Sequence, residues 1–319
     1  MKNKRKNYYC KISVIIPAKN EAENIQRCIK AVKTQTFLPL EFIVVDNGST
    51  DDTVQLAKNL GATVFIKPKV NVGELRNVGA KFAKGNILAF LDADCKPDKN
   101  WLLYSVSTLN KKGIGAVGSP VLPSDNENWV EKTWYFNLHC SYQNAKYINS
   151  ANLIIWKEIF DKLHGFDHRL NAGEDRDLCW RIDKIGAKIF IDRRILVRHY
   201  GYPKSMTQFF RREFWHGNSI ESDFRNLRKT RILFLVISNS IFYVGIIVSL
   251  LAGHISVASF FLGMCLLLSF AISAVRCHLG KGYEFILRLA LLYFIYFMAR
   301  TIAFFNVIFK SVRTVFSMH

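Results

Sequence analysis

Asp92 and Asp94 are separated by one residue and directly follow the apolar run from Ile87 to Leu91, which predicts a buried strand. The carboxyl edge of an open α/β sheet is where such sheets usually bind ligands. Two carboxylates at that edge suit a hard divalent cation, Mg²⁺ or Mn²⁺, held against the phosphates of a nucleotide. A solvated turn or a helix cap gives the same Asp-x-Asp pattern, so the neighbouring sequence has to support the metal site.

Two more polar clusters directly follow predicted strands. Residues 17–21 follow a strand over 12–16, and residues 46–51 follow a strand over 42–45. Because the carboxyl ends of parallel strands share one edge of a sheet, both clusters should meet the Asp-x-Asp pair there. Asp46 is then placed to accept hydrogen bonds from a base or ribose, and Arg76 brings a cation to a phosphate or base. The residues that we expect to bind the nucleotide portion of a ligand are Pro17, Asn20, Glu21, Asp46, Asn47, Gly48, Ser49, Arg76, Asn77, Asp92 and Ala93.

An acidic cluster over residues 172–177 opens a predicted helix directly after Gly173. Acids in a first helical turn match the helix dipole and need no other role. The functional alternative is a general base that removes a proton from an acceptor hydroxyl as it attacks a sugar carbon with oxocarbenium character. His199 ends a predicted strand; it is either a structural histidine or a group that completes the metal or diphosphate site.

Strand and helix signals alternate through the first 120 residues, which predicts βαβ units and a mostly parallel, Rossmann-like α/β sheet. Asn20 is expected to cap the first helix, and Ser49 or Thr50 the second. The expected strands cover residues 12–16, 42–45, 63–66, 87–91 and 114–118, and the region over 120–200 should add strands at 151–156, 188–191 and 195–198 and a helix at 175–185.

The C-terminal part of the chain has the composition of a membrane protein. Residues 232–275 contain no Asp, Glu, Lys or Arg, and these 44 residues are long enough for two spanning helices, near 232–252 and 256–275. An apolar buried hairpin is the alternative. Residues 283–309 form a third apolar segment that charged residues interrupt, so it either spans the membrane or lies in the interface.

Basic residues flank the two predicted spans, in a linker over 218–231 and again after residue 275. The positive-inside rule therefore predicts a multi-pass protein of the cell membrane with residues 1–231 in the cytoplasm. An amphipathic helix over 205–217, rich in aromatic residues and arginine, should lie at the level of the lipid headgroups. The expected domains are a catalytic domain over 1–217, the linker, and a membrane region over 232–319.

The net charge is strongly positive. Residues 1–231 contain 38 Lys and Arg against 24 Asp and Glu, a net charge of +14. Next to a membrane anchor, this surplus indicates attraction to anionic lipids and anionic substrates. A nucleic-acid partner is not expected, because no basic block is interleaved with stacking aromatic residues in a recognisable module. The seven cysteines form no C-x-x-C pair, which is typical of reduced cysteines in a cytoplasmic protein.

Six motifs in order carry a resemblance to a known family. They are Ile15–Glu21, Val44–Thr53, Arg76–Gly79, Leu91–Asp94, Gly165–Asp167 and Gly173–Arg181. Over about residues 10–217 the sequence resembles family 2 glycosyltransferases with a GT-A fold. The resemblance implies an inverting, metal-dependent transferase that takes a sugar from a nucleotide-diphosphate donor. It further implies that Asp46 contacts the base or ribose, that Asp92 and Asp94 serve the metal and diphosphate, and that Asp175 is the base with Glu174 beside it.

The chain departs from processive members of that family, which carry a Gln-x-x-Arg-Trp signature. Here the segment from Gln208 ends in Arg211 and Arg212, with arginine in place of tryptophan. This difference favours single transfer over polymerisation, and both arginines are expected to contact the nucleotide sugar. The sequence as a whole predicts transfer to a hydroxyl of a lipid or lipid-linked acceptor at the cytoplasmic membrane face. Polyprenyl phosphate as the acceptor is the first alternative, and an inactive GT-A scaffold for polysaccharide assembly is the second.

Overall fold

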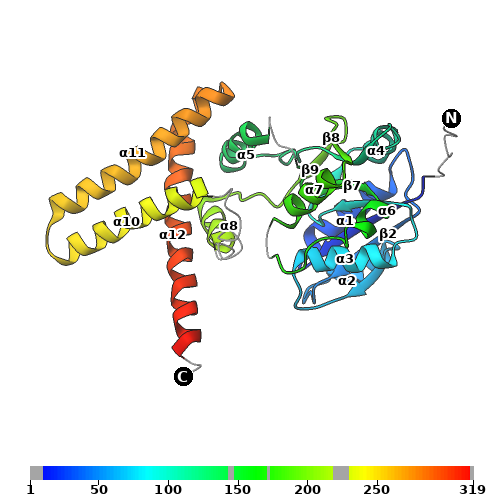
Figure 1. Cartoon of the computed structure of the whole chain (residues 1–319), viewed down its shortest axis with the longest axis horizontal. Coiled ribbons are helices and arrows are strands. Elements are labelled where there is room, and N and C mark those ends of the chain that lie inside the picture. Colours follow the sequence, from blue (N-terminus) through cyan, green and yellow to red (C-terminus); the bar gives the residue numbers. More distant parts are fainter. Residues whose placement is uncertain (1–9, 143–146, 171–172, 218–229, 317–319) are drawn as a thin grey trace. The chain divides into compact units, whose positions relative to one another are not determined.

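The computed structural model describes residues 10–142, 147–170, 173–217 and 230–316 of the 319-residue chain (Figure 1). The chain divides into two compact units. The first contains residues 1–125 and 144–201, and the second contains residues 126–143 and 202–319. The sequence instead predicts a boundary after residue 217.

The first unit is built on a seven-stranded sheet with the strand order β3-β2-β1-β4-β7-β6-β8. Neighbouring strands pair in parallel except for β7, which is antiparallel to both β4 and β6. The predicted α/β, Rossmann-like, mostly parallel GT-A fold is confirmed. The strands are β1 (Ile12–Ala18), β2 (Glu41–Asp46), β3 (Thr63–Ile66), β4 (Ile87–Leu91), β6 (Ile114–Gly118), β7 (Asn152–Trp156) and β8 (Lys188–Ile191).

The central strands are buried along their whole length, as expected of a parallel sheet that helices cover on both faces. All seven residues of β1 and all five of β4 are buried. Helix α1 buries Ile25, Ile29 and Val32, which recur at helical spacing. The helices of this unit are α1 (Ala22–Lys33), α2 (Thr53–Asn59), α3 (Val72–Phe82), α4 (Trp101–Leu109), α6 (Lys157–Lys162) and α7 (Glu174–Lys184).

Two of the predicted helix caps are wrong. Helix α1 begins at Ala22 with Glu21 as its N-cap residue, and Asn20 adopts a left-handed conformation with φ 54°. Helix α2 begins at Thr53, beyond Ser49 and Thr50. The Asp51 carboxylate accepts hydrogen bonds from the backbone N–H groups of both Ala22 and Thr53. The bond to Thr53 is a local contact at the start of α2, as capping by the adjacent acids predicts, whereas the bond to Ala22 is a long-range contact that local sequence rules do not describe.

A second, two-stranded sheet consists of β5 (Cys95–Pro97) and β9 (Val197–His199). The strands are antiparallel, and Cys95 lies directly opposite His199. Directly opposed residues of an antiparallel pair have side chains on the same face. This small sheet therefore brings the residue after Asp94 to His199, more than a hundred residues later in the chain.

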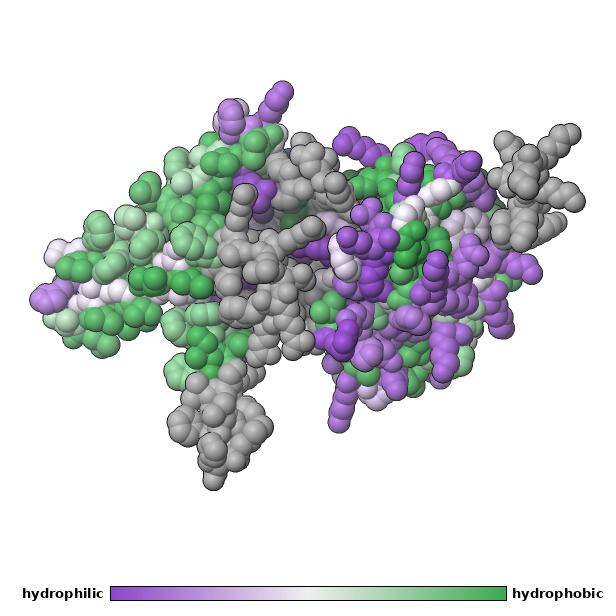
Figure 2. Space-filling model, viewed as in Figure 1, coloured by the Kyte–Doolittle hydropathy of each residue, from purple (hydrophilic) through white to green (hydrophobic). Residues whose placement is uncertain are grey.

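The second unit is helical. It contains α5 (Trp129–Tyr142), α8 (Met206–Gly217), α10 (Thr230–Leu251), α11 (Ile255–Gly280), the short 3₁₀ helix η2 (Tyr283–Phe285) and α12 (Ile286–Phe316). Figure 1 shows α10 and α11 running antiparallel as a hairpin, with α12 crossing it. Among the described residues, three helical segments are long and apolar enough to cross a membrane: Phe234–Leu251, Ile255–Gly280 and Tyr283–Phe309. Apolar side chains dominate the visible surface of this hairpin (Figure 2).

Helix α8, predicted to lie at the headgroup level, packs one face against α12 and α5. Phe209 is fully buried, and its ring lies 4.7 Å from that of Trp134 on α5. The Glu213 carboxylate is buried and forms a 2.8 Å ion pair with Arg300 of α12. This pairing gives the buried Glu213 carboxylate its cation, since a desolvated charge needs a partner. The predicted linker over 218–231 lies almost entirely outside the described residues.

Candidate active site

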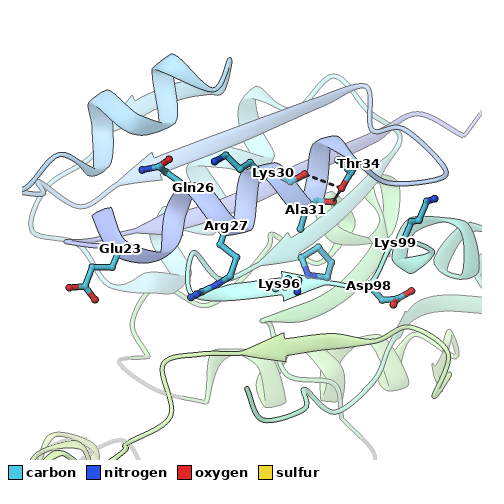
Figure 3. Close-up of a pocket in the computed structure, with 10 residues that line it drawn as sticks. Glu23, Gln26, Arg27, Lys30, Ala31, Thr34, Lys96, Asp98 and Lys99 are labelled. Carbon is cyan, nitrogen blue, oxygen red and sulfur yellow. Dashed lines mark hydrogen bonds between the residues drawn. The ribbon is translucent and has the colours of Figure 1, made fainter. Parts of the chain in front are cut away.

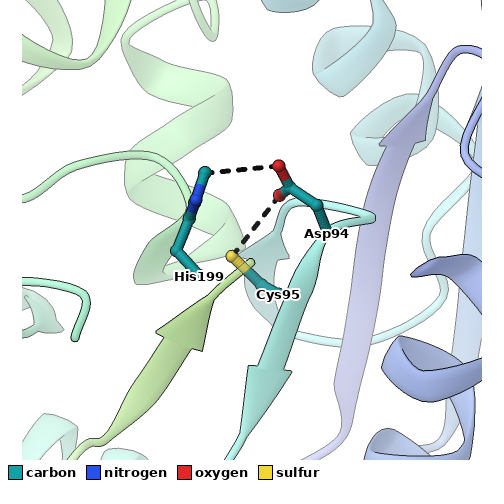
Figure 4. Close-up of side chains that lie close together, drawn as sticks. All are labelled: Asp94, Cys95 and His199. Atoms are coloured by element: carbon teal, nitrogen blue, oxygen red, sulfur yellow. Dashed lines mark hydrogen bonds and ion pairs between the residues drawn. The ribbon is translucent and has the colours of Figure 1, made fainter. Parts of the chain in front are cut away.

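The turn after β4 presents Asp94 to His199. The Asp94 Oδ2 atom lies 3.5 Å from His199 Nε2, and the Cys95 thiol lies 3.8 Å from Asp94 Oδ1 (Figure 4). Potential ligand atoms of these three residues all lie within 4.8 Å of one another. Burial raises the pKa of Asp94, while the neighbouring His199 opposes this shift. The structure thus brings together two of the three predicted metal ligands and adds Cys95, which the sequence analysis did not select.

Gly201 leaves room for the Asp94 carboxylate to lie against the backbone that follows β9. A Cβ atom on Gly201 would lie 1.9 Å from Asp94 Oδ2, so any side chain here would displace the carboxylate. The backbone N–H of Tyr200 donates a 2.9 Å hydrogen bond to the Asp94 carbonyl. This bond also joins the chain after β9 to the Asp-x-Asp turn. A carboxylate and an imidazole held together in this way are a donor set that Mn²⁺ accepts, and a carboxylate alone suits Mg²⁺. The residues present therefore fit a divalent cation.

Arg76 links Asp92 to the acidic helix start. Its guanidinium is buried and pairs with Asp92 Oδ1 at 2.6 Å and with Glu174 Oε1 at 2.9 Å. Ser150 donates a longer hydrogen bond of 3.5 Å to the same Glu174 oxygen. The Arg76 guanidinium is therefore shared by two carboxylates that lie 82 residues apart in the sequence. It joins the predicted metal motif and the predicted base motif into one network.

Replacing Arg76 with methionine should destabilise the protein strongly. The substitution leaves the buried Glu174 and the half-buried Asp92 without their cation, and breaking such a pair from one side costs about 3 kcal/mol or more. We expect a clear fall in the midpoint of thermal unfolding of the full chain in detergent. Arg169→Met is the matched control, because Arg169 pairs with Asp167 while its side chain is 78% exposed. Equal losses in the two variants would contradict a special role for Arg76.

Asp46 builds the turn that follows β2. It is only 1% exposed, and its Oδ1 atom accepts hydrogen bonds from the backbone N–H groups of Gly48 at 2.9 Å and Ser49 at 2.8 Å. The Ser49 hydroxyl donates to the other oxygen. Asn47 bonds the backbone of Val70 through both ends of its amide. These contacts shape the loop at the predicted nucleotide edge, and contact of Asp46 with a base or ribose remains a prediction.

The loop after β1 is bonded to this turn. The Asn20 backbone N–H donates to the Ser49 hydroxyl at 2.8 Å, and the Asn20 Oδ1 atom accepts from the Thr50 N–H at 2.9 Å. Pro17 lies inside β1, one residue before its end. Burial raises the pKa of Glu21 to about 7, and repulsion from Asp94 and Asp92 adds to this shift. The first two clusters and the Asp-x-Asp turn therefore meet at one edge, as the sequence analysis predicts.

Asn77 stabilises a turn of the chain. Its amide donates to the Phe166 carbonyl at 2.8 Å and accepts from the Phe166 N–H at 2.9 Å. Gly165 has φ 69°, and a Cβ atom there would lie 2.4 Å from Asn77 Oδ1. These two hydrogen bonds join the Arg76–Gly79 motif to the Gly165–Asp167 motif, so both motifs are needed for the same turn. Ala93 is buried between the two aspartates.

Asp175 occupies the first turn of α7, next to Glu174. Burial, with repulsion from Glu174 second, raises the pKa of Asp175 to about 6. A carboxylate with a pKa near the operating pH combines basicity with availability, which suits a general base. Gly173 precedes the helix with φ 84°. Arg211 and Arg212 lie on α8 in the second unit, where the Arg212 guanidinium packs over Tyr202; their role in donor binding remains a prediction.

A separate groove of about 840 Å³ runs between α1 and the segment around β5 (Figure 3). The Arg27 guanidinium stacks on the Tyr200 ring at 3.6 Å. None of the residues predicted to bind the nucleotide lines this groove. Its lining residues are Glu23, Gln26, Arg27, Lys30, Ala31, Thr34, Lys96, Pro97, Asp98 and Lys99.

The Rossmann-like sheet, with its Asp-x-Asp turn joined through Arg76 to an acidic helix start, has the GT-A fold. The family model for Glycosyl transferase family 2 matches residues 13–166. Glycosyltransferase AglE of Haloferax volcanii is 33% identical over 206 residues, which cover 60% of this chain and 67% of that protein. The chain belongs to glycosyltransferase family 2, and it is a glycosyltransferase.

Two further comparisons bear on the size and fold of the chain. Pre-mycofactocin glycosyltransferase of Mycobacterium tuberculosis is 26% identical over 260 residues, which cover 76% of this chain. The chain spans about half of that relative, 53% of its length. Mannosyltransferase PcManGT of Pyrobaculum calidifontis, solved with GDP-Man and Mn²⁺, matches with a TM-score of 0.60 at 18% identity, over 94% of this chain and 88% of that one. The structural match shows that the fold is shared.

Proposed function

We propose that this protein is an inverting glycosyltransferase that moves a sugar from a nucleotide-diphosphate donor to a hydroxyl of a lipid or lipid-linked acceptor at the cytoplasmic membrane face. The observation that carries the proposal is the network from Asp94 and Asp92 through Arg76 to Glu174 and Asp175, in a chain with three apolar helices. The network supplies charge for a diphosphate leaving group at one end and a base at the other. The helices confine the enzyme to the surface where lipid acceptors are concentrated.

The donor end of the network suits a divalent cation. Asp94 and His199, with Asp92 nearby, would hold Mg²⁺ or Mn²⁺, and the GDP-Man and Mn²⁺ of PcManGT make Mn²⁺ and GDP-mannose the first pair to test. A bound cation would neutralise the negative charge that develops on the departing diphosphate. Arg76 keeps the Asp92 carboxylate in place through a 2.6 Å ion pair. The residues at the ends of β1 and β2 shape the edge where the nucleotide is expected to bind.

At the other end, Asp175 is the proposed base. Its carboxylate accepts the proton of the acceptor hydroxyl as the hydroxyl oxygen bonds to the sugar carbon and the bond to the diphosphate breaks. A single displacement of this kind inverts the configuration at that carbon. Glu174 is bound to Arg76, so it is a positioning residue that adds negative charge beside Asp175 and helps to raise its pKa.

The rate of transfer should fall at acidic pH. Asp175 accepts a proton only when it is ionised, and because its pKa is raised to about 6, the rate should decline below that pH by about tenfold per unit. The measurement is the initial rate with saturating donor and metal from about pH 5 to pH 8. Glu21→Gln is the control, since burial also raises the pKa of Glu21, to about 7. If the fall in rate at acidic pH disappears in this variant, that fall arises from Glu21 and not from Asp175.

The function itself is tested on membranes that contain the full chain. They are incubated with labelled nucleotide sugars and divalent ions, and lipid products are then separated from aqueous ones. We expect label in the lipid fraction with one donor, and none from membranes that contain Asp94→Asn. Supplying polyprenyl phosphate alone, or a lipid that already carries a sugar, distinguishes the two acceptor classes. An inactive scaffold would give neither lipid product nor donor hydrolysis, and the same result for both proteins.

The proposed topology makes a prediction of its own. The basic residues on both flanks of residues 232–275 favour a cytoplasmic position for both ends of the hairpin. A thiol reagent that cannot cross membranes should label His254→Cys from outside in intact cells, and should reach Lys281→Cys only after the membrane is opened. Both substitutions are made in a chain whose native cysteines are replaced by serine. Labelling at position 281 from outside would reverse the orientation.

A further inference from the structure

The cluster of Asp94, Cys95 and His199 contains a thiol that a Mg²⁺ or Mn²⁺ site does not need. Hard cations take oxygen ligands, whereas a thiol selects softer ions such as Zn²⁺. The backbone aims the thiol at the other two groups, because Cys95 and His199 are directly opposed across β5 and β9. Asp94 directly precedes Cys95, and Gly201 leaves room for its carboxylate. The convergence of the three groups is therefore determined by strand register.

The Asp94 carboxylate lies within 4 Å of both other groups, reaching His199 with one oxygen and Cys95 with the other. Bonds of about 2.0 to 2.3 Å from Zn²⁺ to nitrogen, oxygen and sulfur place neighbouring ligand atoms roughly 3.4 to 3.6 Å apart. His199 Nε2 lies 3.5 Å from Asp94 Oδ2, and Cys95 Sγ lies 3.8 Å from Asp94 Oδ1. The third separation is within 4.8 Å. Small side-chain rotations would complete three corners and leave the fourth to water or a phosphate oxygen.

The three groups of the cluster differ in exposure. The Asp94 and His199 side chains are 17% and 18% exposed, whereas Cys95 is fully buried behind them. Figure 4 shows the Asp94 and His199 side chains close to the Cys95 thiol. The Cys95 thiol donates a long hydrogen bond of 3.8 Å to Asp94 Oδ1, so a metal would replace a weak contact.

We propose that Asp94, Cys95 and His199 form a three-donor site for a thiophilic divalent ion, Zn²⁺ in the first place, and that such an ion competes with the Mg²⁺ or Mn²⁺ of the transfer reaction. When the ion binds, the Cys95 thiol proton passes to the buffer and sulfur bonds to the metal. Sulfur and imidazole favour Zn²⁺ over Mn²⁺. Zn²⁺ should therefore inhibit the enzyme. The inference rests on the proposed function only for this competition, because binding itself needs neither donor nor acceptor.

The test uses the purified full chain in detergent, without nucleotide sugar. Co²⁺ serves as a spectroscopic probe for Zn²⁺, and a sulfur-to-cobalt charge-transfer band should appear that Zn²⁺ abolishes on titration. Cys95→Ser should lose the band and bind Zn²⁺ weaker by about tenfold or more, while binding of Mn²⁺, measured from its free electron-spin signal, changes less. Cys28→Ser is the matched control, since the Cys28 thiol is also buried and contacts the Asp92 carbonyl but lies outside the cluster. This variant should keep the band, as should Cys10→Ser.

Two results would overturn the inference. One is Co²⁺ binding to the wild-type chain without a sulfur band, and the other is a band that survives in Cys95→Ser. If Cys95→Ser does not fold, His199→Ala provides the second test: it keeps the thiol, and its affinity for Co²⁺ should fall by about tenfold or more. An unchanged affinity in that variant would place the metal elsewhere. Because no sugar transfer is measured, an absent band leaves the proposed function untouched, and an inactive enzyme leaves the metal site untouched.

Discussion

Asp94→Asn should lower sugar transfer by roughly 10³-fold, because a charge-stabilising metal site supplies several kcal/mol to a reaction that releases a diphosphate. The substitution keeps the size of the side chain and removes its charge next to His199, 3.5 Å away. Both transfer and hydrolysis of the donor should be lost, since both need the diphosphate to leave. The measurement is the rate of release of free nucleotide with and without acceptor.

Asp98→Asn is the matched control for this variant. Asp98 is exposed just beyond β5, and its side chain accepts a hydrogen bond from the Asn100 N–H that an asparagine oxygen can also accept. Its rate should stay close to that of the wild type. Full activity in the presence of EDTA, or an Asp94→Asn variant as active as Asp98→Asn, would show that this site holds no metal required for the reaction.

Asp175→Asn should lower transfer by about 10² to 10⁴-fold, the usual contribution of a positioned general base. The substitution removes the group whose pKa burial raises to about 6, while the Arg76 pairs with Asp92 and Glu174 stay in place. Donor binding should therefore be retained. The experiment compares the dissociation constant for the nucleotide sugar with the rate of transfer in the same preparation.

Asp177 offers a control on the same helix. It forms an i,i+4 ion pair with Arg181 at 2.6 Å, so Asp177→Asn alters the charge of α7 without touching the proposed base. This variant should transfer sugar at close to the wild-type rate. If donor affinity and transfer fall together in Asp175→Asn, then Asp175 is a structural or donor-site residue, and another base has to be sought.

The sequence was most informative about features that short segments specify by themselves. The apolar runs at 12–16 and 87–91 became buried strands, because parallel strands buried on both faces require continuous apolar residues. Polar residues that directly follow such runs had to meet at one edge of the sheet. The charge-free stretch over 232–275 likewise identified the apolar helices, since composition alone decides whether a segment suits lipid. The alternation of strands and helices was sufficient for the fold class.

Tertiary structure decided which of those residues touch. Arg76 lies 98 residues from Glu174, and Cys95 lies opposite His199 through the pairing of two three-residue strands. Such contacts depend on strand register and on packing of the whole unit, which no local pattern specifies. The same holds for the hydrogen bond that the Asp51 carboxylate accepts at the start of α1. The residue types at the site are thus a property of the sequence, whereas their pairing follows from long-range packing that lowers the free energy of the whole fold.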